Sequence, residues 1–149
     1  MPNDIPPLPE FDLYSFTPYR LAVAAKRTSE ELARKYRERF GISIPEWRVL
    51  VHLAHSGKVS VRDIEARVAM EKYEVSRAAK RLREANLIER KENPTDRRLV
   101  ILTLTPAGHK MMAELLPLAK SHQAALEARL GDAFEQLEAG LEQLLKEPE

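Results

Sequence analysis

The sequence of 149 residues contains no cysteine. This absence excludes disulfides, thiolate catalysis, four-cysteine zinc sites and sensing through an oxidised thiol. It fits a reducing compartment, and we expect a cytoplasmic protein. The chain also lacks a glycine-rich phosphate loop, and no serine or histidine stands in a nucleophile motif. We therefore predict that the protein is not an enzyme and uses no cofactor.

Long hydrophobic runs are absent as well. No apolar stretch approaches the roughly 20 residues that a membrane-spanning helix needs. The first sixteen residues hold four prolines and three acidic residues without an apolar segment, which is not the pattern of a secretory signal. We expect a soluble protein that has no membrane partner.

Neither sign of charge dominates the whole chain, since 24 Lys and Arg stand against 23 Asp and Glu, but the distribution is uneven. Residues 72–98 hold nine basic and five acidic side chains, whereas residues 106–149 hold four basic and eight acidic ones. The positive field is therefore local. The length suits one domain, and we predict a single domain over residues 1–149 with helical extensions.

Apolar residues recur at helical spacing over six segments. Thr17 with Pro18 is typical of a helix start, and Ser43 with Glu46 forms a capping-box pattern. Pro117 predicts a kink inside the fifth segment. The predicted helices cover approximately residues 17–40, 44–55, 61–68, 71–85, 106–130 and 132–147.

The helix predicted over residues 71–85 has two different faces. At 100° per residue, small apolar side chains fall in one arc and polar ones fall opposite. The first group is expected to pack, and it comprises Val75, Ala78, Ala79, Leu82 and Ala85. The second group is free to meet a partner, and it comprises Tyr73, Ser76, Arg77, Lys80 and Glu84. Asn86 follows, a residue that accepts the left-handed conformation at a helix end.

A basic β-hairpin is expected directly after this helix. Residues 87–92 and 99–104 have strand character and flank a turn whose tip holds Asp96, Arg97 and Arg98. An exposed hairpin held by ion pairs, with a stabilisation under about 1 kcal/mol, is the alternative interpretation. The preceding cationic helix favours a winged helix-turn-helix that binds DNA. The predicted fold is therefore mainly α with a small β-hairpin wing.

Four segments between Ile42 and Gly108 resemble the MarR family of bacterial winged helix-turn-helix transcription regulators. The last of them matches the family's wing signature, D-x-R followed by L-x-L-T-x-x-G. The matching residues are 45–50 (PEWRVL), 75–82 (VSRAAKRL), 86–90 (NLIER), and Asp96, Arg98, Leu102, Leu104, Thr105 and Gly108. One departure is Asn86, where many members of the family have glycine.

This resemblance implies a homodimer built from the first and last helices, which binds a palindromic operator with paired helices in successive major grooves and wings in the minor grooves. It also implies release by a small ligand, often an aromatic acid. The winged-helix part is expected at about residues 43–105, with dimerisation helices at about 11–41 and 106–147.

The candidate DNA contacts lie on the wing and on the presumed reading helix. Arg98 matches the family's wing arginine and is expected in a narrow minor groove, with Asp96 pairing with it or capping the turn. On the helix, Arg77 and Lys80 are expected to reach guanine edges or phosphates. Ser76 and Tyr73 are expected to contact phosphates or bases. Further candidates for backbone contacts are Arg97, Lys91 and Arg62.

For two further groups of residues, a role in binding a ligand or metal competes with an ordinary structural role. Arg20, Trp47 and Arg48 are candidates for binding an anionic aromatic effector, although Trp47 is favoured as a core residue. His52 and His55 have a spacing that can hold a metal, but no third ligand lies near in sequence, so ordinary histidines are favoured and no metal site is predicted.

The function we predict is a sequence-specific DNA-binding regulator, a ligand-responsive repressor that acts as a homodimer. One alternative is a winged-helix module that binds another protein. A second is a DNA-binding regulator without a small-molecule effector.

Overall fold

The computed structural model describes residues 4–67, 70–96 and 99–146, and it divides the chain into two compact units, Met1–Glu31 and Leu32–Glu149. The division falls inside helix α1 (Thr17–Phe40). In the first unit a short 3₁₀ turn, η1 (Leu13–Ser15), precedes α1, and the Asp12 carboxylate accepts a hydrogen bond from Tyr14 N at 3.1 Å. Several large apolar side chains of this unit are exposed: Ile5, Leu8, Phe11, Tyr14 and Phe16.

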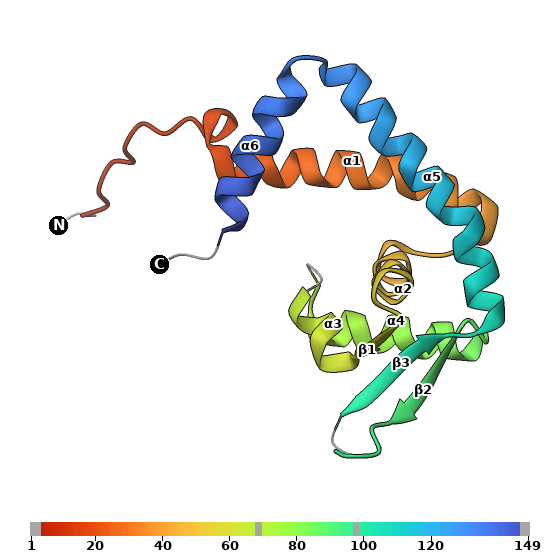
Figure 1. The fold of residues 1–149 in the computed structure, drawn as a ribbon. Helices are drawn as coiled ribbons and strands as arrows, with labels where there is room; N and C mark the ends of the chain where they lie inside the picture. Colours follow the sequence, from red (N-terminus) through yellow and green to blue (C-terminus); the bar gives the residue numbers. More distant parts are fainter. Residues whose placement is uncertain (1–3, 68–69, 97–98, 147–149) are drawn as a thin grey trace. The chain divides into compact units, whose positions relative to one another are not determined.

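The second unit continues from α1 through helices and a small sheet (Figure 1). Its elements are α2 (Ile44–Ser56), β1 (Lys58–Ser60), α3 (Val61–Arg67), α4 (Lys72–Glu84), β2 (Ile88–Glu92), β3 (Val100–Leu104), α5 (Pro106–Leu130) and α6 (Ala133–Leu145). The mainly helical fold with a β-hairpin wing is confirmed. None of the helices within the described residues is both long and apolar enough to cross a bilayer.

The sheet has three antiparallel strands in the order β1-β3-β2. β2 and β3 form the predicted hairpin, in which Arg90 pairs with Leu102. β1 was not predicted, because three residues are too few to show the alternating pattern of a strand. This short strand pairs with β3, and its Val59 lies opposite Leu102, with both side chains buried. The third strand therefore fixes the base of the hairpin to the helices.

The core of the second unit lies among α2, α4, the sheet and the start of α5. α2 contributes Val49, Leu50 and Leu53, and its first turn is closed by the predicted capping box of Ser43 and Glu46. The largest of the fully buried side chains are those of Tyr36, Leu50, Leu53, Ile64, Leu82, Leu102, Met112 and Leu115. Most of the predicted packing face of α4 is buried, but Ala85 is exposed, because the helix ends at Glu84.

A close joint connects the end of α4, the start of β2 and the start of α5. Asn86 has a φ of 61°, and Leu87 N donates to Leu82 O, as in a Schellman ending of a helix. The Thr105 hydroxyl donates to Asn86 O at 2.7 Å and accepts a hydrogen bond from Gly108 N at 3.0 Å. A Cβ atom on Gly108 would lie only 2.0 Å from Leu87 O. Glycine is therefore needed for α5 to begin this close to the strand.

The terminal helices follow the predicted segments. α5 is continuous through Pro117, and the kink predicted there stays a prediction. α6 contains no buried residue, and its Leu137, Leu144 and Leu145 are exposed. Of the helix predicted over residues 61–68, the last residue, Val68, lies outside the described residues.

Candidate nucleic-acid interface

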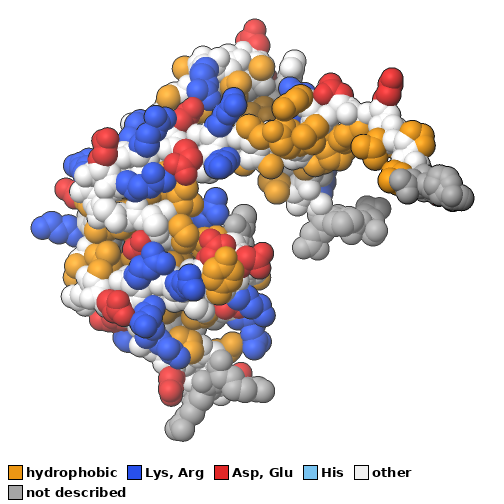
Figure 2. Space-filling view, turned by 180° about the vertical axis from the view of Figure 1, so that it is seen from behind, with side chains coloured by type: hydrophobic (Ala, Val, Ile, Leu, Met, Phe, Trp, Pro, Cys, Tyr) orange, Lys and Arg blue, Asp and Glu red, His pale blue; other side chains and the backbone are white. Residues whose placement is uncertain are grey.

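The outer face of α4 carries the predicted helix candidates. Tyr73, Ser76, Arg77 and Lys80 are all exposed, because the opposite face packs into the core. The Arg77 guanidinium carbon lies 5.4 Å from the centre of the Tyr73 ring, close enough for a cation–π contact. Lys and Arg side chains gather on the face of the molecule that Figure 2 shows, with Asp and Glu among them. The structure thus brings the helix candidates together on one surface.

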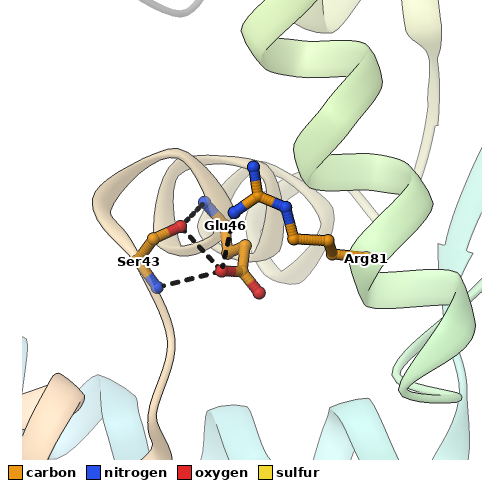
Figure 3. Close-up of polar contacts among 3 residues, drawn as sticks. All are labelled: Ser43, Glu46 and Arg81. Atoms are coloured by element: carbon orange, nitrogen blue, oxygen red, sulfur yellow. Dashed lines mark hydrogen bonds and ion pairs between the residues drawn. The ribbon is translucent and has the colours of Figure 1, made fainter.

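Arg81, another cation of α4, points to α2 (Figure 3). Its Nη1 lies 3.9 Å from Glu46 Oε1, and the Glu46 side chain is only 14% exposed. The same carboxylate oxygen accepts hydrogen bonds from Ser43 N at 3.1 Å and Ser43 Oγ at 2.7 Å. Glu46 therefore closes the first turn of α2 and holds α4 against it. Arg81 thus connects α4 to α2 through its ion pair with Glu46.

The turn of the wing is organised by Asn93. Its side-chain oxygen accepts hydrogen bonds from Thr95 N at 2.9 Å, Thr95 Oγ1 at 2.8 Å and Asp96 N at 3.3 Å. Leu99 N donates to Asp96 O at 3.0 Å, and Asn93 N donates to Leu99 O at the same distance. Asn93 therefore caps this turn, and the pairing or capping role of the Asp96 side chain stays a prediction. The two arginines of the tip, Arg97 and Arg98, lie outside the described residues, so their roles stay predictions.

Asn93 was missed in the sequence, although the Asn-Pro dipeptide at residues 93–94 signals a turn. A side-chain amide that accepts several main-chain hydrogen bonds is a common way to close such a turn. Lys91, a proposed backbone contact, is exposed on β2 and lies 3.9 Å from Glu89 of the same strand. The Glu89 carboxylate therefore compensates part of the positive charge of Lys91.

A cleft of about 340 Å³ lies between α3, α4 and the hairpin. Three arginines line it, Arg62 from α3, Arg83 from α4 and Arg90 from β2, together with one acidic residue, Glu65. The Nε of Arg83 is buried, and no group within the described residues accepts its hydrogen bond. The excess of positive charge suits an anion. Of these three arginines, only Arg62 was predicted from the sequence as a DNA contact, because tertiary packing brings Arg83 and Arg90 together.

The predicted effector residues lie in different units. Arg20 is exposed in the first unit. In the second unit, Trp47 is half-buried and stacks on Tyr36, with ring centres 5.4 Å apart and an angle of 20° between the planes. This packing agrees with the core interpretation of Trp47. Arg48 is half-buried on the same helix, and its role in effector binding stays a prediction.

His52 and His55 lie on α2, and His52 is partly buried. Burial lowers the pKa of His52, and the positive charges of Arg67 and His55 lower it further. The described part of the chain contains no group of three potential metal ligands. The neutral form of His52 is thus favoured in the folded protein.

Comparisons with known proteins point to one family. The model of the MarR family matches residues 40–99. A curated relative, the HTH-type transcriptional repressor MdtR of Bacillus subtilis (strain 168), is 33% identical over 87 residues, which cover 58% of this chain and 56% of the relative. The chain thus matches about half the length of that protein, and the relative is a regulator rather than an enzyme.

Solved structures with the same fold include two regulators. A point mutant of MarR from E. coli complexed with operator DNA has a TM-score of 0.73 and 22% identity, covering 85% of this chain and 92% of its own. Bordetella bronchiseptica BpsR, whose DNA binding is regulated by 6-hydroxynicotinic acid, has a TM-score of 0.78 and 21% identity, covering 95% and 100%. At these identities the similarity establishes the winged-helix fold.

Proposed function

Because the model of the MarR family matches residues 40–99, we propose that the chain is a transcriptional regulator of this family that binds duplex DNA through α4 and the wing. The observation that carries this proposal is the exposed face of α4, where Tyr73, Ser76, Arg77 and Lys80 lie beside the basic hairpin. α4 would enter the major groove, and Arg98 of the wing would enter the adjoining minor groove. Arg77 and Lys80 would provide the contacts to base edges or phosphates.

The cleft next to α4 extends the proposed footprint. Its lining contains three arginines, Arg62, Arg83 and Arg90, and a single acidic residue, Glu65. A phosphate of the DNA backbone would neutralise part of this charge through charge-assisted hydrogen bonds with the guanidinium groups. These contacts would set the position of the protein on DNA without adding sequence preference.

We further propose that the protein acts as a homodimer on a palindromic operator and represses transcription. Exposed Leu137, Leu144 and Leu145 on α6 support a second copy as the partner of that helix. Repression is the described role of the relative MdtR. An aromatic acid is the proposed effector class, by analogy with the regulation of BpsR by 6-hydroxynicotinic acid. Arg20, Trp47 and Arg48 remain the residues proposed to bind it.

Selection of bound duplexes from random DNA, followed by affinity measurements at several salt concentrations, tests the proposal. A dimer that neutralises about 6–10 phosphates would lose about 10³–10⁵ in affinity between 50 and 200 mM salt. Arg98→Ala should weaken binding with the dimer intact, and Arg77→Ala should also relax base preference. A monomer that selects no sequence, or binding that is insensitive to salt, would instead favour a protein-docking module.

A further inference from the structure

We propose that Tyr73 is a positioning residue for DNA recognition, whose ring holds the Arg77 guanidinium ready for a base edge. The inference rests on the proposed function, because it assumes that α4 reads DNA. It adds a different role for Tyr73 from the direct contact predicted in the sequence. The role follows from three features of the pair: its geometry, its surroundings and its direction on the helix.

The geometry places one side chain over the other. Tyr73 and Arg77 are four residues apart, so they lie on the same face of α4, one turn apart. The guanidinium carbon is 5.4 Å from the ring centre, inside the distance at which an aromatic face attracts a cation. Tyr73 is 59% exposed. Its ring therefore contributes little to the core, and it remains available to its neighbour.

The surroundings of Arg77 differ from those of Arg81. Arg81 faces the Glu46 carboxylate at 3.9 Å, whereas no acidic group pairs with Arg77 within the described residues. A carboxylate would occupy the N–H donors of a guanidinium, but an aromatic face touches the plane of the group and leaves the donors at its edge. Tyr73 thus orders Arg77 without using the hydrogen bonds that a guanine edge needs.

The direction of the pair suits a reading helix. Helical side chains lean towards the N-terminus, so the head of Arg77 lies over the turn that contains Tyr73. This is the first turn of α4, which begins at Lys72. Recognition helices place their N-terminal residues against base edges. Ordering a long side chain before binding removes part of the entropy cost of the complex.

A double-mutant cycle tests the inference. Tyr73→Leu removes the ring and keeps apolar bulk, Tyr73→Phe keeps the ring and removes the hydroxyl, and each is made alone and with Arg77→Ala. Affinity is measured by fluorescence anisotropy with the selected duplex and with duplexes changed at one base pair each. Circular dichroism and urea unfolding verify that every variant folds.

Tyr73→Leu should weaken binding about two- to fivefold per reading helix, or about four- to twenty-fivefold for a dimer. It should also reduce discrimination at the base pair that Arg77→Ala affects, while Tyr73→Phe retains both properties. In the Arg77→Ala background, Tyr73→Leu should have no further effect, because the ring then has nothing to hold.

Three results would overturn the inference. Equal loss from Tyr73→Leu with and without Arg77 would place Tyr73 directly on DNA. Equal loss from Tyr73→Phe and Tyr73→Leu would assign the effect to the hydroxyl. Tighter binding by Tyr73→Leu would mean that the ring withholds Arg77 from DNA. Failure of the proposed function is distinguishable, since Arg77→Ala alone would then change neither affinity nor base preference.

Discussion

Gly108→Ala should break the joint between α5 and the base of the wing. The added Cβ would lie 2.0 Å from Leu87 O and 3.2 Å from Leu104 Cδ2, whereas ordinary contacts begin at about 3.4 Å. The nearest obstacle is a main-chain carbonyl in a buried position, which no rotamer change can move. The first turn of α5 must therefore shift by more than an ångström, and the hydrogen bonds of Thr105 across the joint must stretch.

The expected loss of stability follows from these contacts. Forcing an extra methyl group into a packed site costs about 1–3 kcal/mol. Thr105 N donates to Leu87 O at 3.0 Å and its hydroxyl donates to Asn86 O at 2.7 Å, and each bond contributes about 1 kcal/mol. The better helix propensity of alanine returns about 1 kcal/mol. We expect the free energy of unfolding to fall by about 3 kcal/mol.

Urea unfolding followed by the fluorescence of the single tryptophan, Trp47, provides the assay. Its indole stacks on buried Tyr36, so its signal reports on the core. Protein concentration must be constant, because association changes apparent stability. Gly140→Ala is the matched control: within the described residues, no atom outside the adjoining helix backbone lies within 4 Å of its Cβ position in α6, so it should stabilise by about 1 kcal/mol. If the free energy of unfolding of Gly108→Ala lies within about 0.5 kcal/mol of the wild-type value, which is the usual error of such comparisons, the steric argument is refuted.

Three other perturbations test the packing of α4 and α2. Arg83→Met keeps the aliphatic part of the side chain and removes a buried Nε that has no hydrogen-bond acceptor within the described residues. The free energy of unfolding should therefore stay unchanged or rise by up to about 1 kcal/mol. Its DNA affinity should fall equally for all sequences, and a loss confined to one base pair would contradict the phosphate assignment. Glu46→Ala should cost about 1–2 kcal/mol in urea unfolding, more than Arg81→Ala, because the carboxylate also caps α2; equal losses would argue against the capping role. Since the pKa of His52 is below 6.5 in the folded protein, the unfolded chain takes up this proton first as the pH falls. The free energy of unfolding should therefore decrease below about pH 6.5, and His52→Gln should remove part of that decrease in pH-dependent unfolding. An identical pH profile for the variant would exclude His52 as a source.

Local signals in the sequence predicted most of the elements. The capping box of Ser43 and Glu46 is visible because its partners are three residues apart, and α2 begins where it predicts. Asn86 was expected to adopt a left-handed conformation, and its φ is 61°. The exposed face of α4 follows from periodicity alone, because Val75 and Leu82 fix the opposite side in the core.

Features that depend on contacts between distant segments were not predicted. β1 is three residues long, and its strand character comes from pairing with β3 more than forty residues later. Ala85 was assigned to the packed face by extending the helical period past the last turn, but the chain leaves the helix at Glu84. The arginine cleft needs α3, α4 and β2 together, so no spacing in the sequence indicates that Arg83 and Arg90 are neighbours.

The joint around Gly108 has a consequence for how regulation would work. It ties the end of α4, the start of β2 and the first turn of α5 through main-chain hydrogen bonds, so these elements move together. In a dimer the two copies of α4 must lie about 34 Å apart to enter successive major grooves. An effector changes affinity only if it binds better to one spacing than to another. Since the joint is tightly packed around Gly108, a change of spacing in the proposed dimer would arise elsewhere, in α5 beyond its first turns or between the protomers.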